Sequence, residues 1–425
     1  MTSLDPQPPR RALDGLRVLD LSRVLAGPFC CMMLADHGAD VIKVEPPGGD
    51  ETRHYGPPFV DGESVYYMNV NRNKRGMVLD LSKRAGQEIV RRLAQTSDVL
   101  VENFKTGTME RWGLGYDGLR ELNPRLVYAA ISGFGRDGPY ANVAGYDGAL
   151  QAFGGFMSIN GEAGGQPLKA GIAIADLTTG LFASQAILLA LQNRNATGLG
   201  QLVEVSLLES LVGLLHPHNT NYLNAGVVGK PHGNSHPMIS PYDLLPTADR
   251  PIYLPSGNDA QFQRLAKVLG RPELGDDPRF RTNQDRVEHR AEMLAALAEE
   301  FRKWPAGELC RKLWDANVPA GPVNSLDEVF RDPQVQHRRL VREIPHPALS
   351  AGVFRSVAPP ARLHDTPGGV RRYPPRPGEH TVEILQELGY GPAEVQQLLE
   401  LGAAAQLGMA DPPGSAAVPL SHSGA

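Results

Sequence analysis

Short apolar segments alternate with helical ones along the first half of the chain, and this alternation constrains the fold more than any other feature. Val18–Leu21 and Val41–Val44 are typical of strands, and the stretch between them, Phe29–His37, has helical composition. Two strands joined through a helix form a β-α-β unit, in which the strands lie parallel. The pattern recurs in the strands Met77–Leu81, Asp98–Glu102 and Leu126–Ile131 and in the helices Arg84–Gln95 and Leu119–Leu122. The sequence therefore predicts an α/β fold built on a parallel sheet.

The same alternation continues past a region of glycine-rich loops. Ile172–Ala175 is predicted as a strand, and Leu177–Gln192 as a mostly buried helix. Leu202–Val205 is a further strand, followed by an apolar helix at Leu207–Leu215. Ser82 is the expected N-cap of the helix that begins at residue 84, because serine often caps helices through its hydroxyl oxygen.

The chain of 425 residues is too long for one ordinary core, so two domains are expected. The composition changes near residue 225, where Pro, Gly, His and Asn become frequent. We expect a large domain over 13–225, a smaller α+β domain over 226–325, a final part over 326–402, and loose tails at 1–12 and 403–425. The final part is Pro-rich and extended up to residue 378, and two helices close it.

Composition excludes several classes of protein. A net charge of −5 gives no basic surface for nucleic acid, and no run approaches the ~20 apolar residues of a membrane span. Met1–Ala12 has no apolar signal-peptide core. Cys30, Cys31 and Cys310 are an odd set without disulfide spacing, so we expect small buried thiols. These features predict a cytoplasmic protein without a nucleic-acid or membrane partner.

Parallel sheets bind ligands beyond the carboxyl ends of their strands, so the segments that follow strands are candidates. The first, Ser22–Pro28, is not a G-x-G-x-x-G loop, and the chain has no Walker-type phosphate loop. The sequence therefore gives no motif that would indicate a dinucleotide or nucleoside triphosphate site. A small Gly-Pro turn suits a ligand with a flat apolar part, although an ordinary strand-to-helix turn has the same composition.

Two further segments combine cations with polar or aromatic residues. Asn71–Arg75 holds three cations in five residues, a pattern that binds phosphate or forms a solvated surface. Glu102–Lys105 follows a strand, and Arg111 and Trp112 lie a turn later. An aromatic ring beside cations can hold an adenine and its phosphates.

Asp176 directly follows a predicted strand and begins a long apolar helix. Aspartate at this position is an ordinary N-cap. The same geometry also suits a nucleophile, because the helix dipole is expected to keep the carboxylate ionised. His216 and His218 invite a metal hypothesis, but Pro217 separates them and no further ligand lies near, so we expect loop histidines and no metal.

Taken together, the segments resemble the class III CoA-transferase family, which includes formyl-CoA transferase, carnitine CoA-transferases and α-methylacyl-CoA racemase. The resemblance covers about residues 13–402. The matching stretches are Leu13–Ser22, Val24–Pro28, Gly38–Glu45, Asn73–Arg75, Val101–Phe104, Glu121–Pro124, Ser132–Gly135, Gly145–Asp147, Gly233–Pro237, Pro241–Tyr242 and Gly378–Thr381.

The resemblance implies a Rossmann-like large domain, an inserted smaller domain, and a homodimer of two interlocked rings. It places the catalytic nucleophile on Asp176. No permanent cofactor is implied, and coenzyme A or acyl-CoA is the substrate. The residues expected to contact CoA and its thioester are Leu25, Ala26, Lys74, Leu79, Asp80, Leu81, Ser82, Asn103, Phe104, Lys105, Arg111, Tyr146 and Asp147.

Departures from the family narrow the expected substrate. Leu25 and Pro46 stand where the formyl-CoA enzyme has Gln and Arg, which argues against formate and oxalate. Tyr146 replaces the histidine of the racemase branch, and racemisation needs two acid/base groups. The context resembles the succinyl-CoA:dicarboxylate branch most closely. An α-methylacyl-CoA epimerase and a catalytically silent CoA-binding protein remain the alternatives.

The expected reaction runs through an aspartyl anhydride and an aspartyl-CoA thioester. Succinyl-CoA is the expected donor, and a short dicarboxylate is the expected acceptor. The acceptor's second carboxylate needs a cation or several donors. Arg23, Lys169 and the loop at 234–236 are the candidates.

Overall fold

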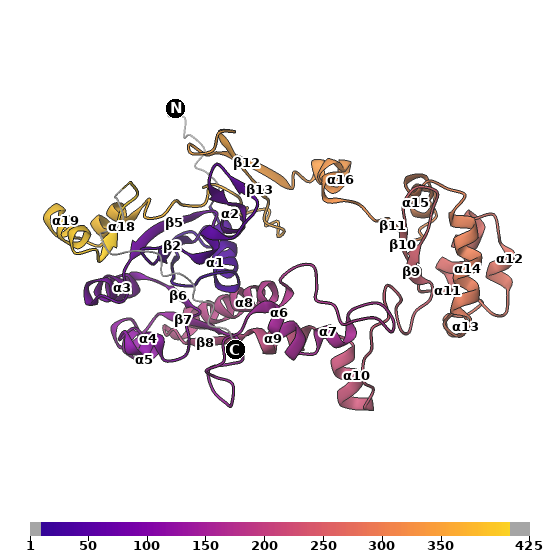
Figure 1. Ribbon diagram of the computed structural model, residues 1–425, viewed down its shortest axis with the longest axis horizontal. Helices are drawn as coiled ribbons and strands as arrows, with labels where there is room; N and C mark the ends of the chain where they lie inside the picture. Colours follow the sequence, from indigo (N-terminus) through magenta and orange to yellow (C-terminus); the bar gives the residue numbers. More distant parts are fainter. Residues whose placement is uncertain (1–9, 409–425) are drawn as a thin grey trace. The chain divides into compact units, whose positions relative to one another are not determined.

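The computed structural model describes residues 10–408. Its centre is a seven-stranded sheet in the order β14-β5-β2-β1-β6-β7-β8 (Figure 1). Six of these strands are parallel, and only β14 runs antiparallel, against β5. The strands are β1 (Arg17–Asp20), β2 (Asp40–Glu45), β5 (Lys74–Leu79), β6 (Val99–Glu102), β7 (Val127–Ser132), β8 (Leu202–Ser206) and β14 (Ala404–Ala405). The predicted α/β fold with a parallel sheet is confirmed.

Helices cover both faces of this sheet because alternate residues of each strand point to opposite sides. On one face, Leu19 of β1 and Met77 of β5 form a core with α3, whose Ile89 and Leu93 lie four residues apart. The helices of this face are α3 (Arg84–Thr96), α4 (Thr108–Arg111), α5 (Tyr116–Leu122), α18 (Thr381–Glu387) and α19 (Pro392–Glu400). Helices α18 and α19, which come from the C-terminal stretch of the chain, therefore complete the same core.

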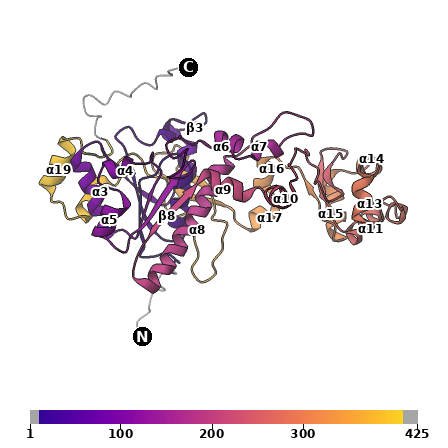
Figure 2. The ribbon, with the colours of Figure 1, turned by 90° about the horizontal axis from the view of Figure 1, so that it is seen from below.

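The opposite face carries α1 (Ala26–Asp36) and α8 (Ile174–Thr197), which pack on one another. Figure 2 shows the length of α8, with α9 (Leu207–Leu214) beside it and β8 nearby. Shorter elements also occur along the chain up to residue 225. They are η1 (Glu51–His54), β3 (Phe59–Val60), β4 (Glu63–Ser64), α2 (Val65–Val70), α6 (Asp147–Phe153), α7 (Phe156–Ile159) and α10 (His218–Ala225).

The described chain divides into two compact units. The first consists of 10–154, 170–219 and 339–408, and the second of 155–169 and 220–338. The longer segment of the second unit, 220–338, begins and ends near the expected boundaries of 226 and 325, whereas the segment 155–169 was expected in the large domain. That it is an inserted domain stays a prediction.

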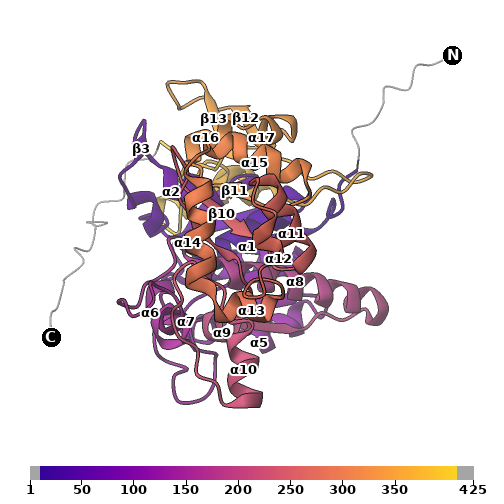
Figure 3. The same cartoon turned by 90° about the vertical axis from the view of Figure 1, so that its right-hand side faces the viewer.

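The second unit has its own sheet and core. Strands β9 (Tyr242–Leu245), β10 (Ile252–Pro255) and β11 (Gly321–Pro322) are antiparallel. Figure 3 shows α14 and α11 on either side of β10. The helices are α11 (Asp259–Val268), α12 (Glu273–Asp276), α13 (Asn283–Glu288), α14 (Arg290–Phe301), α15 (Ala306–Asp315), α16 (Leu326–Arg331) and α17 (Pro333–His337). An antiparallel sheet packed with helices is the α+β arrangement that the sequence predicted for this region.

Three local predictions were wrong. Ile172–Ala175 is not a strand, because α8 already begins at Ile174, and a short apolar run fits a first helical turn equally well. Ser82 does not cap α3, since the N-cap is Lys83 and the Ser82 hydroxyl instead donates to Asp80. The stretch between residues 325 and 378 is not extended throughout. It holds α16, α17 and a hairpin of β12 (Val341–Pro345) and β13 (Val353–Val357).

The predicted loose tails are only partly visible. Residues 1–9 and 409–425 lie outside the described residues. The expected C-terminal tail began at 403, but Ala403 is buried and Ala404 and Ala405 pair with β5. Small side chains at these positions let the chain lie flat against the sheet edge.

Candidate active site

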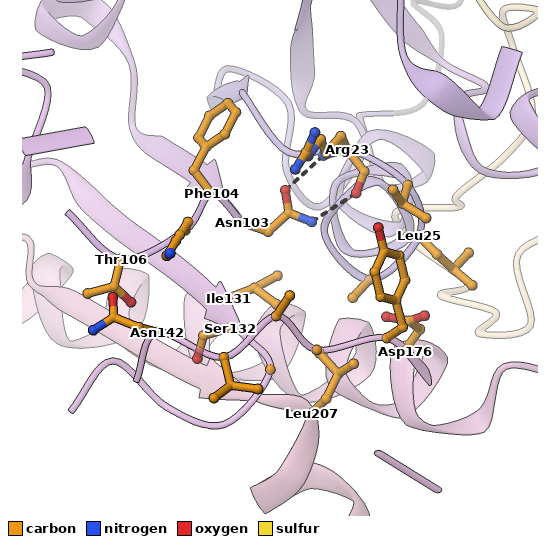
Figure 4. Close-up of a pocket in the computed structure, with 18 of the residues that line it drawn as sticks. Arg23, Leu25, Asn103, Phe104, Thr106, Ile131, Ser132, Asn142, Asp176 and Leu207 are labelled. Carbon is orange, nitrogen blue, oxygen red and sulfur yellow. Dashed lines mark hydrogen bonds between the residues drawn. The ribbon is translucent and has the colours of Figure 1, made fainter. Parts of the chain in front are cut away.

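The sheet order reverses at β1, because the chain winds from β1 to β2 and β5 on one side and continues to β6, β7 and β8 on the other. Ligands of such sheets bind in the crevice beyond the carboxyl ends of the strands at this switch point. A cavity of about 330 Å³ lies there (Figure 4). It is lined by Arg23, Val24, Leu25, Ala26, Glu51, Asn103, Phe104, Lys105, Thr106, Ile131, Ser132, Gly133, Ala141, Asn142, Val143, Ala144, Gly145, Tyr146, Asp176 and Leu207.

The turn after β1 is held in a strained shape by the loop after β6. The Asn103 side chain accepts a hydrogen bond from the Arg23 backbone N–H at 2.9 Å and donates one to the Arg23 carbonyl at 2.8 Å. The next residue, Val24, has φ of +66°, which β-branched residues rarely adopt. Strain of this kind costs about 1–3 kcal/mol and gathers at functional sites. The two loops that border the switch point are thus locked together.

Asp176 reaches the cavity because α8 lies unusually close to α1. A Cβ at Gly180 would be only 2.7 Å from the Ala26 carbonyl oxygen and 3.0 Å from the Phe29 ring. Only glycine allows this approach. Asp176 lies four residues earlier on the same helix face, so the contact at Gly180 brings its carboxyl group to the N-terminal end of α1.

Asp147 caps α8 from a distance of 29 residues in sequence. Its Oδ1 accepts hydrogen bonds from the backbone N–H groups of Ala175 at 2.8 Å and Asp176 at 3.3 Å. Its Oδ2 accepts from Gln151 at 2.5 Å, and Gln151 in turn accepts from the Ala170 N–H. Asp147, and not Asp176 as the sequence suggested, therefore caps the N-terminus of α8.

The Asp176 carboxyl group is half-buried and accepts no hydrogen bond from the chain that the structure describes. Burial raises its pKa to about 7, and the negative charge of Asp147 adds to the shift. The sequence predicted that the helix dipole keeps this carboxylate ionised, and burial and the charge of Asp147 act in the opposite direction. A carboxylate without hydrogen-bond donors keeps its lone pairs free, which suits nucleophilic attack.

The sequence profile of CoA-transferase family III matches residues 13–381. The chain belongs to this family. It is 47% identical to a succinate–glutarate CoA-transferase of Agrobacterium fabrum, over 88% of this chain and 95% of the relative. It is 40% identical to the human succinyl-CoA:glutarate CoA-transferase, over 92% and 89% of the two chains. Among solved structures, a CaiB/BaiF family protein from Brucella suis matches with a TM-score of 0.81 and 42% identity, covering 89% of this chain and all of that one.

The cavity of the transferase brings together seven of the predicted site residues. Leu25 comes from the turn after β1, Ala26 is the first residue of α1, and Asp176 comes from α8. Phe104 contacts Trp112 edge-on with ring centroids 5.2 Å apart, so one edge of its ring packs on the core while the residue lines the cavity. The seven are Leu25, Ala26, Asn103, Phe104, Lys105, Tyr146 and Asp176. Their contacts with CoA stay a prediction.

Other predicted residues of the transferase do not line this cavity. Leu79 is fully buried in the core beneath α3, so its side chain is unavailable to a ligand. The Asp80 carboxylate accepts a hydrogen bond from the Ser82 backbone N–H, and Leu81 packs against the core. Residues 80–82 directly follow the end of β5. The exposed Arg111 guanidinium donates to Thr108, one helical turn beyond the lining loop.

The solvated-surface interpretation of Asn71–Arg75 was wrong, because all three of its cations are buried. Lys74 is fully buried, and its ammonium group lies 2.9 Å from an Asp20 carboxylate oxygen. Arg75 pairs with Asp40 and two glutamates of α18, and its side chain is 9% exposed. Buried charges need partners of opposite sign, and these partners come from other strands and helices that the local sequence does not reveal.

Sequence reasoning missed two side chains near Asp176. Glu51 lines the cavity from η1. Tyr66 on α2 has a raised pKa, caused first by burial and then by the charge of Asp176. Both lie between β2 and β5, in a segment without a recognisable motif, so only the fold places them at the site.

Three further findings bear on the expected class of protein. Among residues 10–408, no three His, Cys, Asp or Glu side chains are grouped as a metal ion would need. One helix, α8, is long and apolar enough to span a membrane by length and composition alone. That helix packs against α1 and carries Asp176, as the core helix of a folded unit does. The three cysteines are buried and unpaired, as predicted.

Proposed function

We propose that this transferase moves CoA from succinyl-CoA to a short dicarboxylic acid, with Asp176 as the covalent nucleophile. The observation that carries the proposal is the half-buried Asp176 carboxyl group, free of hydrogen bonds, in the cavity at the switch point of the sheet. The relatives named for transfer between succinyl-CoA and glutarate support the choice of substrates.

The reaction begins when an Asp176 carboxylate oxygen attacks the thioester carbonyl carbon of succinyl-CoA. The carbon–sulfur bond breaks, and a succinyl-aspartyl anhydride and the CoA thiolate form. The thiolate then attacks the Asp176 acyl carbon of the anhydride, which gives an aspartyl-CoA thioester and releases succinate. Each intermediate is an activated acyl group, so the reaction requires neither ATP nor a metal ion.

The second half reverses these steps with a different acid. A carboxylate of the acceptor attacks the aspartyl-CoA carbonyl carbon, and the thiolate leaves again. The thiolate attacks the acceptor's acyl carbon in the mixed anhydride, which yields acceptor-CoA and restores the Asp176 carboxylate. Water would hydrolyse the anhydride and must be excluded. The N-terminal N–H groups of α1 and the backbone at Gly133 line the cavity and can stabilise the oxyanions.

Trapping the intermediate tests the nucleophile. We expect the protein incubated with succinyl-CoA and then with hydroxylamine to gain the mass of a hydroxamate on the peptide that contains Asp176. Asp176→Ala should neither transfer CoA nor gain that mass, while its far-UV circular dichroism stays unchanged. A hydroxamate on another residue, or transfer by the variant, would contradict the mechanism.

Two other outcomes would identify the alternatives. Exchange of the α-hydrogen of a branched acyl-CoA in D₂O, without transfer, would indicate an epimerase. Binding of acyl-CoA without transfer or trapping would indicate a silent CoA-binding protein. Faster transfer to a branched fatty acid than to succinate, glutarate or malate would refute the dicarboxylate assignment.

The proposed assembly is the interlocked homodimer that the resemblance implies. Helix α8 supports it because the helix is apolar on both sides. Ala183 and Ile187 are buried, whereas Leu181 is 50% and Leu189 64% exposed. A soluble protein rarely leaves a large apolar helix face uncovered. Sedimentation equilibrium should give twice the mass of one chain, and a monomer at micromolar concentration would contradict the proposal.

A further inference from the structure

Arg23 is a cation in the cavity that leaves its charge available. Its side chain is 58% exposed, and no side chain in the described part of the chain accepts a hydrogen bond from its guanidinium group. The closest anion is Glu51, with an N–O distance of 3.7 Å. This separation exceeds the 2.7–2.9 Å of a charge-assisted hydrogen bond, so the donors of Arg23 remain unsatisfied.

The backbone of Arg23 is fixed although its side chain is not. Both hydrogen bonds from Asn103 go to the main chain of Arg23, and the strained Val24 follows. The guanidinium group therefore extends from a rigid point at the edge of the cavity. A fixed cation of this kind can accept a carboxylate through two parallel hydrogen bonds.

Arg23 also lies on the side of the cavity that holds the nucleophile. In Figure 4, Leu25 lies between Arg23 and Asp176, whereas Thr106 and Asn142 lie at the opposite end. Lys105, the other cation that lines the cavity, precedes Thr106 on the loop after β6. The two cations thus belong to different ends of the site.

We propose that Arg23 binds the distal carboxylate of the dicarboxylic acid, and that Glu51 holds this cation until the acid arrives. This inference rests on the proposed transfer to dicarboxylates and names the residue that selects them. Glu51 is itself held in place, because its Oε2 accepts a hydrogen bond from the Tyr55 hydroxyl at 2.9 Å. The incoming carboxylate replaces a weak ion pair by a hydrogen-bonded one, while the second carboxylate faces Asp176.

The proposal predicts opposite effects for the two partners. Arg23→Gln removes the charge that binds the distal carboxylate, so kcat/KM for glutarate should fall about tenfold or more. Arg23→Lys should retain part of the activity because it keeps the charge. Glu51→Gln removes the competing anion but keeps an acceptor for Tyr55, so the KM for glutarate should decrease.

Pentanoate is the matched acceptor, since it has the same five carbons with a methyl group in place of the distal carboxylate. Arg23→Gln should leave kcat/KM for pentanoate within about twofold of the wild type. Where pentanoate turns over too slowly, its inhibition constant against glutarate gives the same comparison. Lys105→Gln is the control, and it should change both acids alike and raise the KM for succinyl-CoA.

The failure of this inference differs from the failure of the proposed function. Wild-type protein that transfers CoA to neither acid would refute the function. Wild-type transfer together with an equal loss for glutarate and pentanoate in Arg23→Gln would overturn the role of Arg23 alone. An increased KM for glutarate in Glu51→Gln would overturn the role of Glu51. Circular dichroism of each variant monitors folding, and Arg23→Lys supplies a second measurement of the charge.

Discussion

Replacing Asp176 by asparagine should stabilise the protein at alkaline pH while it abolishes transfer. The folded protein binds the Asp176 proton more tightly than the unfolded chain, because the pKa rises from its ordinary 3.8 to about 7. Below pH 4 the carboxyl group is protonated in both states and has no effect on stability. As the pH rises from 4 to 7, only the unfolded chain loses the proton, so stability falls. Above pH 7 the full cost of the buried charge is present.

The rise of the Asp176 pKa from 3.8 to about 7 corresponds to ~4 kcal/mol. Asp176 is only half-buried, so solvent screening reduces this cost, and we expect about 2 kcal/mol. Asp176→Asn removes the charge with little change in shape. We therefore compare the variant with the wild type by the difference between their free energies of unfolding. This difference should be about 2 kcal/mol larger at pH 8 than at pH 4.5.

Urea unfolding followed by circular dichroism, at one protein concentration and several pH values, measures this difference. The matched control is Asp137→Asn, since Asp137 is exposed and its change should give no such trend. A constant offset of the kind that any substitution produces does not matter, because only the pH-dependent part reports the charge. A difference between Asp176→Asn and the wild type that stays the same from pH 4.5 to 8 would refute the cost of burial.

Three further predictions follow from the same site. The kcat/KM for transfer should rise with pH around a midpoint near 7, because only the ionised Asp176 attacks. Asp147→Asn should move that midpoint to lower pH by removing a like charge, and an unchanged midpoint would contradict an electrostatic effect of Asp147 on Asp176. Gly180→Ala should lower kcat about a hundredfold or more, since the added Cβ meets a backbone oxygen and displaces Asp176; wild-type turnover would show that the helices can separate. Arg111→Ala should raise the KM for every acyl-CoA more than it lowers kcat, and an unchanged KM would remove Arg111 from the phosphate site.

The sequence predicted the sheet because each strand is a short apolar run, and parallel pairing follows from the helices between them. It also indicated the loops at the switch point, since Arg23 and Asn103 directly follow strands. It could not reveal that Asp147 caps α8, because the two meet through the fold across 29 residues. It could not reveal that Lys74 is buried, because a run of cations looks the same whether its partners are phosphate, water or buried carboxylates.

The short strand β14 has a consequence for how the chain is assembled. It pairs with Val78 and Leu79 at the outer edge of β5, and it is made of residues near the end of the described chain, 404 and 405. During synthesis, more than 300 residues follow β5 before these two residues are paired, and the whole of the second unit is made in that interval. An open edge strand can pair with other chains. Residues 372–381 also hydrogen-bond to this edge. Nascent or truncated chains that end before residue 372 should therefore aggregate through β5, and full-length chains escape this route only after release of their C-terminal stretch.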